Sequence, residues 1–478
     1  MTASGKNSKF LFGFFSVIFL VFAVQATLKQ QLWLLAIPFV MVLLYAAWQM
    51  IDHVFLLLLF FIPFSMELQV TDTLGTDFPD EPLMLLTTML VCFYWAYHPV
   101  LLSRRTIVHP LLILVFIGFA WAVISSLFST FPLLSFKFLL AKTWYFGAFI
   151  LAPLVLFREK RQIRTGVTVL ATGVILVTLI TLVRHAVYGF TFVSINEAVQ
   201  PFSRNHVNYS AILVCTIPVV FVYWRTKEAG RLKTLTTIVL IILLLAIFLS
   251  YARGAWLALF TGIGAAWLIR KRAIVTAYVV MIMLVIAALF WLKDNDRYLR
   301  YAHDYDTTIW HENFSEHLSA TYEFKDASTA ERFYRWIAGV RMVKDHWLTG
   351  FGPNSFYDNY KPYAVPAFRT WVSDNPEHST VHNYFLLITV EQGIPGLLFF
   401  LLLTIAMLYY AQYLYHRAND IFYKRVALLA GVVTIMILTV NFLSDLIETD
   451  KIGSVFFLCL SLLIITDRNT KSASSNVL

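Results

Sequence analysis

Long apolar runs separated by short polar segments recur along most of this chain of 478 residues. A helix of about 20 apolar residues is long enough to cross the hydrocarbon core of a bilayer. A water-soluble core cannot hide this much apolar surface, since 59% of the residues are hydrophobic and only 14% are charged. The backbone of a lipid-embedded segment must satisfy its own hydrogen bonds, so each run is predicted to be helical.

The apolar runs predict an all-α polytopic transmembrane helical bundle of about 12–14 spans. The run at 54–66 is the shortest of them, and the first run is also compatible with a signal peptide. We favour an uncleaved first span, because no acidic or soluble mature domain follows it. The predicted spans cover residues 10–26, 32–49, 54–66, 82–97, 110–128, 134–156, 163–186, 207–223, 233–250, 254–269, 273–292, 393–415, 425–443 and 452–466.

Lysine and arginine gather in alternate loops, which the positive-inside rule assigns to the cytoplasm. Both termini fall on that side, which predicts a multi-pass membrane protein with cytoplasmic ends. The net charge of +9 then reflects topology and does not indicate nucleic-acid binding. The basic loops are 104–105, 158–164, 225–233, 270–272, 417–425 and 468–471.

A long hydrophilic segment, 293–380, falls on the opposite, extracytoplasmic side. It separates the transmembrane helices of 1–292 from those of 381–478. Its mixture of acids, bases and aromatic residues predicts a folded, partly helical loop. The three cysteines lie within predicted spans, so neither a disulfide framework nor a thiolate metal site is expected.

Arg253 stands out because it lies between two predicted spans with almost no loop, in SYARGAWLAL. The predicted topology puts it at the outer boundary of the membrane, where a positive charge is not needed to set orientation. Such a position costs roughly 1–3 kcal/mol unless the guanidinium finds a partner or reaches the headgroups. We favour an anion-binding role over that of an interfacial anchor.

Two further arginines, Arg332 and Arg335, lie on a helix predicted in the outer loop. Ser328 and Glu331 fit a capping box at its start, and Gly350 is expected to end it. Arginines on an amphipathic helix are ordinary when taken alone. Their functional interest depends on Arg253 and on a histidine farther along the chain.

That histidine is His382, which follows a possible N-cap at Ser379. It is therefore expected in the first turn of a helix that returns to the membrane. The positive end of a helix disfavours protonation, so the imidazole would stay neutral and suit a general base. The alternatives are a capping or packing histidine, or a metal ligand with His378; no third ligand is apparent, so no metal site is predicted.

Other outward-facing cations are predicted to line a pocket for an anionic lipid headgroup. Lys137 and Lys142 lie near the outer end of one span, and Arg204 precedes another. Lysines within a span usually face a cavity or a partner, although long side chains can also reach the interface by themselves.

A polyprenyl diphosphate presents two phosphates at the membrane surface while its tail lies in lipid. Arginines at the bilayer edge can hold these phosphates and neutralise the charge that grows on the diphosphate as it leaves a sugar. A histidine could accept the proton of the attacking hydroxyl. Arg253, Arg332 and His382 meet these needs.

These residues resemble the O-antigen ligase and O-antigen polymerase superfamily of integral-membrane C-type glycosyltransferases. The matching pieces are SYARGAWLAL, ERFYRWIAGVRMVKDHWLTGFG and HNYFLLITVEQG, which together with the outer loop cover about residues 200–400. Each motif is weak by itself, whereas their order, spacing and sidedness make the set specific. Departures from the family pattern are Tyr251-Ala252 and Trp347-Leu348, where a second serine or threonine and a proline are common.

The resemblance implies that Arg253 and Arg332 contact the donor diphosphate and that His382 assists the acceptor hydroxyl. The reaction it implies is an inverting transfer that needs no metal ion and no cofactor. Asn205 and Asn208 look like the asparagines that precede a span in many members, so Asn208 joins Arg335, Lys142, Lys137 and Arg204 as a candidate substrate-binding residue.

The function expected from the resemblance is transfer of a glycan from undecaprenyl diphosphate to an acceptor at the outer face of the membrane. With lipid A core as the acceptor, the enzyme would be a ligase. A carrier-linked glycan would make it an O-antigen or exopolysaccharide polymerase, and a protein hydroxyl would make it an O-oligosaccharyltransferase. A transporter for a lipid-linked glycan remains an alternative of another class, although its ionisable residues should lie near the membrane midplane.

Overall fold

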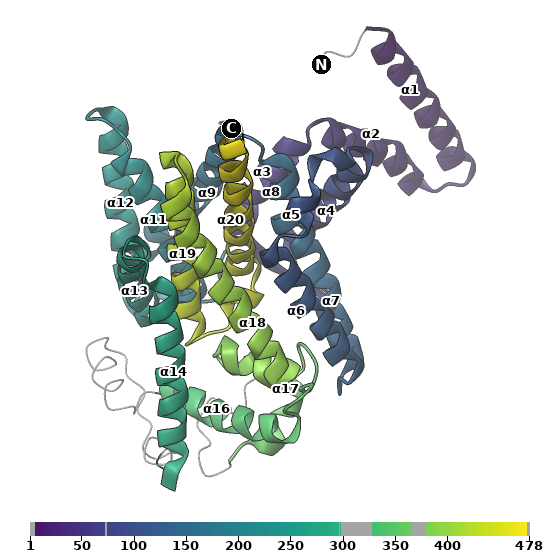
Figure 1. The fold of residues 1–478 in the computed structure, drawn as a ribbon. Coiled ribbons are helices and arrows are strands. Elements are labelled where there is room, and N and C mark those ends of the chain that lie inside the picture. Colours follow the sequence, from purple (N-terminus) through teal and green to yellow (C-terminus); the bar gives the residue numbers. More distant parts are fainter. Residues whose placement is uncertain (1–4, 72–73, 296, 298–326, 366–378, 476–478) are drawn as a thin grey trace.

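The computed structural model describes residues 5–71, 74–295, 297, 327–365 and 379–475 (Figure 1). The described chain is almost entirely helical, as predicted from the apolar runs. Its helices are α1 (Gly5–Leu28), α2 (Ala36–Gln49), α3 (Ile51–Phe61), α4 (Asp80–Tyr97), α5 (Arg104–Ile107), α6 (Pro110–Leu127), α7 (Pro132–Phe146), α8 (Ala152–Leu156), α9 (Lys160–Val187), α10 (Ile195–Val199), α11 (His206–Arg225), α12 (Arg231–Leu249), α13 (Arg253–Arg270), α14 (Ile274–Lys293), α16 (Ala327–Asp345), α17 (Phe356–Asn359), α18 (Tyr384–Arg417), α19 (Ile421–Asn441) and α20 (Asp450–Ser475).

Short 3-10 turns and one π-helical turn join several of these helices. The 3-10 turns are Leu32–Leu35, Ile62–Phe64, Pro99–Leu101, Lys361–Tyr363 and Leu446–Glu448, and the π turn is Gly147–Leu151. An antiparallel hairpin of β1 (Met66–Thr71) and β2 (Leu74–Phe78) pairs Met66 with Phe78 and Glu67 with Asp77.

Fewer helices than the 12–14 predicted spans meet, by themselves, the length and hydropathy of a membrane-crossing helix in the described part of the chain. Within the described residues, eight helices are long and apolar enough to cross a membrane, and a ninth span results if the bent pair Trp33–Gln49 and Ile51–Phe64 counts as one. That pair was predicted as two spans, but its halves meet at 95°. The first helix contributes only a short apolar stretch, Ser16–Leu28. The predicted spans in α4, α13 and α20 do not qualify either, and each of these helices has charged residues at or near its ends.

The helices form an upright bundle, with α16 and α17 lying across one end (Figure 1). We call this the site end, and the opposite end, toward which the last turns of α20 point, the far end. Helix α20 runs through the middle of the bundle, where Leu460, Leu463 and Ile465 are completely buried. A helix that is apolar on all sides is expected in such a position.

Helices α13 and α19 pack antiparallel, which places Arg253 in the bundle. Thr261 and Thr439 share a hydrogen bond of 2.9 Å, and a Cβ on Gly262 would lie 2.1 Å from the end of the Met436 side chain. Because the helices run in opposite directions, the start of α13 lies beside the end of α19. Arg253 is therefore at the site end.

Helix α18 is broken at Gly393, where the backbone has φ +71° and ψ −179°. The segment after α16 docks into this break: Ile394 N donates to Trp347 O (2.8 Å), Phe351 N donates to Val390 O (3.0 Å), and Gly352 N donates to Glu391 O (2.8 Å). Polar groups of α6 complete the junction, since Ser125 Oγ donates to Thr349 O and Trp121 Nε1 donates to Gln392 O, both at 2.8 Å. The loop after α16 and the membrane helix α18 thus form one connected unit.

Candidate active site

His382 lies just before helix α18, and the prediction that it belongs to the first turn is wrong. The helix begins at Tyr384 and its N-cap is Asn383, whose Oδ1 accepts a hydrogen bond from Leu386 N at 3.0 Å. Asparagine is as good an N-cap as serine, and it satisfies a donor that the helix leaves unpaired. Ser379 therefore does not cap this helix. His382 has a φ of +52°, a left-handed conformation that is uncommon for residues other than glycine.

Asp445, on the turn between α19 and α20, faces His382. Its Oδ1 lies 3.8 Å from His382 Nδ1, and its Oδ2 accepts a hydrogen bond from Thr380 Oγ1 at 2.6 Å. The backbone adds a further tie, because Tyr384 N donates to Ser444 O at 2.9 Å. These contacts hold the segment that carries His382 against the α19–α20 turn.

Helix α16 is attached to the same segment from the other side. Arg335 Nη1 donates to Thr380 O at 2.8 Å, and Trp336 Nε1 donates to Val381 O at 3.0 Å. Arg335 is only 3% exposed, and its Nε also donates to Glu331 Oε1 at 2.8 Å. The structure therefore brings Arg335 to the site, as a buried arginine already paired with a carboxylate.

Arg332 lies one turn earlier on α16 and is half-buried. Its charge and that of Arg335 are both close enough to act on His382. The hydrogen bonds of Arg335 and Trp336 to Thr380 and Val381 place the first turns of α16, with Arg332, beside the segment of His382 at the site end. Arg253, also half-buried, starts α13 at the same end, where the N-cap position is Ala252 and provides no side-chain hydrogen bond.

Lys142 of α7 forms a 2.6 Å ion pair with Glu448 on the α19–α20 turn, and both are largely buried. Its ammonium also lies 5.0 Å from the centroid of the Phe138 ring and 5.3 Å from that of Tyr145. Lys142 therefore faces the bundle interior next to the turn that carries Asp445, and it neutralises a carboxylate there. A lysine within a span was expected to face a partner and not lipid, and Lys142 does so, with Glu448 as its partner.

The remaining candidates are exposed or have partners other than His382. Lys137 is exposed on the first part of α7. Arg204, also exposed, forms a 3.3 Å ion pair with Glu67 of the β1–β2 hairpin. Asn208 lies in the first turn of α11, and its backbone N donates to Asn205 Oδ1 at 3.1 Å. Asn205 is the N-cap of α11, so this pair of asparagines has a structural role at the start of a span.

The surroundings of His382 favour its neutral form. Burial lowers the pKa of His382 below its usual 6.5, and the positive charges of Arg332 and Arg335 lower it further. Burial also raises the pKa of Asp445, while the hydrogen bond from Thr380 and the charge of Arg335 act in the opposite direction. An imidazole in this environment is available as a proton acceptor at neutral pH.

We expect this lowered pKa to be visible in the pH dependence of the reaction. A base with an ordinary pKa becomes protonated, and activity is lost, as the pH falls through 6.5. With the pKa of His382 lowered, kcat/KM should stay level from pH 8 down to at least about pH 6 and decline only below it. A pH–rate profile of the purified protein provides the measurement, and an acid limb centred at or above pH 6.5 would contradict the prediction.

Within the described residues, no group of three or more His, Cys, Asp or Glu side chains is placed to hold a metal ion. The alternative that paired His382 with His378 in a metal site involves a residue outside the described part of the chain.

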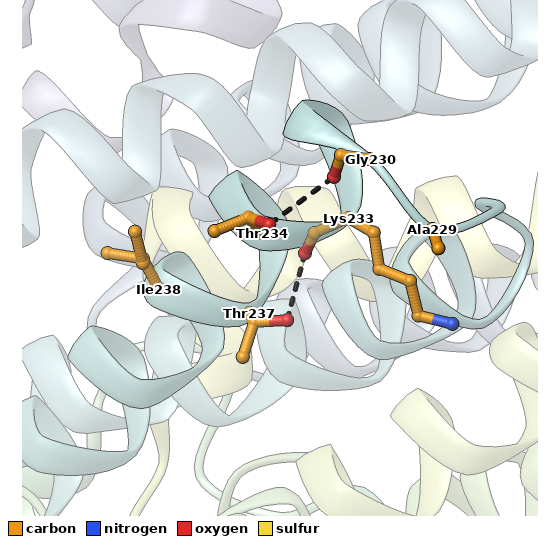
Figure 2. Close-up of a pocket in the computed structure, with 6 residues that line it drawn as sticks. All are labelled: Ala229, Gly230, Lys233, Thr234, Thr237 and Ile238. Carbon is orange, nitrogen blue, oxygen red and sulfur yellow. Dashed lines mark hydrogen bonds between the residues drawn. The ribbon is translucent and has the colours of Figure 1, made fainter.

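A pocket at the start of α12 is separate from this site. Figure 2 shows its lining residues, Ala229, Gly230, Lys233, Thr234, Thr237 and Ile238. Helix α12 has 19 residues and is roughly 28 Å long. The pocket lies at the start of this helix and Arg253 follows its end, so the two are about a membrane thickness apart. Its threonine hydroxyls donate to backbone carbonyls of α12 and the preceding residue, and Lys233 lies over the Trp224 ring. Nothing in this pocket corresponds to the predicted chemistry.

Asp445 and Thr380 are the site residues that sequence reasoning missed. In the sequence, Asp445 lies in an acidic loop with Glu448 and Asp450. The available signal was that it directly follows a predicted span on the same side as His382. Sequence alone did not link the two, because 62 residues, including all of α18 and α19, separate them.

Comparison with known protein families provides independent information on this region. Residues 238–401 match the family model for O-antigen ligase. A comparison with curated proteins finds no match. The matched region contains Arg253, Arg332 and His382, whereas Lys142 and Asp445 lie outside it. The family resemblance predicted from the three motifs is confirmed.

Proposed function

We propose that this chain, whose residues 238–401 match the family model for O-antigen ligase, is a membrane enzyme that transfers a glycan from undecaprenyl diphosphate to an acceptor. The acceptor is a hydroxyl of the lipid A core or of a similar glycolipid. The observation that carries this proposal is that Arg335 and Trp336 donate hydrogen bonds to Thr380 O and Val381 O, which joins the helix that carries Arg332 to the segment that carries His382 at one end of a membrane bundle. No metal ion or cofactor is required for this chemistry.

In this reaction the acceptor oxygen attacks the anomeric carbon of the donor sugar, and the bond from that carbon to the diphosphate oxygen breaks. The proton of the acceptor hydroxyl passes to His382. Its Nδ1 faces Asp445, which leaves Nε2 to take the proton. The 3.8 Å separation of His382 and Asp445 is longer than a hydrogen bond, but such contacts commonly shorten when substrate binds.

The leaving diphosphate gains negative charge as the bond breaks, and Arg253 and Arg332 bind it. Arginine can hold two phosphate oxygens at once and remains charged at any physiological pH. The start of α13 supports this role, because the positive end of the helix dipole coincides with Arg253 and no side chain caps it.

The other basic candidates have supporting roles in the proposal. Arg335 adds positive charge to the site and holds Thr380 by a hydrogen bond to its carbonyl oxygen. Lys142 forms an ion pair with Glu448, on the turn that also carries Asp445. Lys137, Arg204 and Asn208 are proposed to contact the carrier headgroup or the glycan at the margin of the site.

The site end is proposed to face the periplasm, with both termini in the cytoplasm of a bacterial inner membrane. The distribution of Lys and Arg among the loops supports this orientation. In this arrangement the carrier lipid of the donor lies in the bilayer while its diphosphate reaches the arginines.

The products of purified protein test the function and separate its variants. The protein is incubated with an undecaprenyl-diphosphate-linked glycan and either lipid A core, a second carrier-linked glycan or an acceptor protein. One block attached to lipid A core is the expected result. A ladder of repeat multiples would identify a polymerase, and modified protein an O-oligosaccharyltransferase. Absence of transfer to every acceptor, with intact folded protein, would overturn the proposal.

A further inference from the structure

Tyr251 has an unusual backbone conformation at a functionally important place. It lies on the turn between α12 and α13, two residues before Arg253, with a φ of +55°. A large side chain in the left-handed region is strained, and such a residue persists only where its surroundings hold it there. Strain of this kind is frequent at functional sites, so the contacts of Tyr251 are of interest.

The side chain of Tyr251 is held by the segment that follows α9. Its hydroxyl donates to Phe190 O at 2.7 Å. The ring packs edge-on against Phe192, with centroids 5.5 Å apart, and faces His185 at 6.5 Å. His185 is in turn tied to this segment, because its Nε2 lies 3.0 Å from Thr191 O. Tyr251 is thus held in place by residues about 60 positions away in the sequence.

The turn is also fixed from the α12 side, so its remaining freedom is small. Ser250 is completely buried, and its Oγ donates to Ile247 O at 2.7 Å. Trp256 Nε1 donates to the same carbonyl at 3.1 Å. Only Ala252 separates Tyr251 from Arg253. The backbone direction at Tyr251 therefore sets the direction in which α13 begins and in which Arg253 leaves the helix.

We infer that Tyr251 is a positioning residue for Arg253, acting through its hydrogen bond to Phe190 and its ring contacts with His185 and Phe192. This inference rests on the proposed role of Arg253 in binding the donor diphosphate. It assigns a function to residues 185–192, which otherwise only connect α9 to the rest of the bundle. The effect should appear in donor binding, because the acceptor hydroxyl and His382 do not depend on this turn.

The test uses Tyr251→Phe, which removes only the hydroxyl, in the purified full-length protein. Loss of one hydrogen bond is expected to raise the KM for the carrier-linked donor about 3- to 10-fold, with kcat and the acceptor KM little changed. Tyr188→Phe is the matched control, because Tyr188 belongs to the same segment and is 44% exposed. It should behave like the wild type.

A double-mutant cycle with Arg253→Lys shows whether Tyr251 acts through Arg253. If it does, the fold-increase in donor KM of the double variant will be smaller than the product of the fold-increases of the two single variants. Multiplicative effects would indicate a separate, structural role and overturn the inference. So would a normal donor KM in Tyr251→Phe while Arg253→Ala abolishes transfer. Normal transfer by Arg253→Ala would instead overturn the proposed function itself.

Discussion

Replacing Arg253 or Arg332 with alanine is expected to lower glycan transfer at least about 100-fold while the protein remains folded in the membrane. Removing one preorganised group that stabilises charge in a transition state typically has an effect of this size. Here the lost group is an arginine that we propose to hold the departing diphosphate through two oxygens at once. His382→Ala should have a comparable effect, because the acceptor hydroxyl loses its base.

Matched controls distinguish this effect from a general loss of positive charge. Arg270 lies at the opposite end of α13 from Arg253, and Arg341 is an exposed arginine on the same helix as Arg332. Alanine at either control position should leave transfer unchanged. Lysine at Arg253 or Arg332 keeps the charge but cannot bind two oxygens in the same way, so intermediate activity is expected.

The measurement is the initial rate of transfer from a carrier-linked glycan, with the amount of each variant determined by size-exclusion chromatography in detergent. Near-normal transfer by the alanine variants of Arg253, Arg332 and His382 would exclude the proposed site. Equal losses in the controls would show that overall charge, and not these residues, matters.

The second large effect is expected for Gly393→Ala, which should prevent accumulation of folded protein. Gly393 has a φ of +71°, and a Cβ there would lie 2.0 Å from Leu348 O and 2.8 Å from Trp347 O. Both are backbone atoms, so no flexible side chain can move aside. Backbone strain alone costs about 1–3 kcal/mol, and the steric clash adds to it.

This clash would also disturb the site, because the same junction positions the loop after α16. Glu391 Oε1 accepts hydrogen bonds from Ser355 N at 3.1 Å and Phe356 N at 3.2 Å. Gly350 also approaches backbone closely, because a Cβ on it would lie 2.3 Å from Glu391 C. The Gly-Phe-Gly turn and the Glu-Gln-Gly stretch, which are separate motifs in the sequence, are therefore two halves of one contact.

Gly264→Ala provides the control for Gly393→Ala. Gly264 lies in α13, has no positive φ, and a Cβ there would meet nothing within 4 Å. Because alanine favours a helix over glycine, this variant should be at least as stable as the wild type. Membrane abundance and thermal stability in detergent are the readouts. A Gly393→Ala protein with wild-type stability would show that the break in α18 does not require glycine.

Several features of this protein could be predicted because they depend on short stretches of sequence. Apolar length and the placement of Lys and Arg indicated a membrane bundle, and the three motifs indicated the superfamily. Counting apolar runs treats the halves of the 95° bent pair as separate crossings, whereas together they are long enough for one span. The bend is a property of packing and is not visible in composition.

The sequence by itself determined the chemical character of the site, namely arginines and a histidine beside membrane helices. Only the tertiary structure decided how they are held: Asp445 faces His382, and the Tyr251 hydroxyl donates a hydrogen bond to Phe190 O. The physical reason is distance along the chain. Helix formation and membrane insertion are governed by neighbouring residues, whereas these contacts join segments about 60 residues apart and exist only once the helices between them have packed.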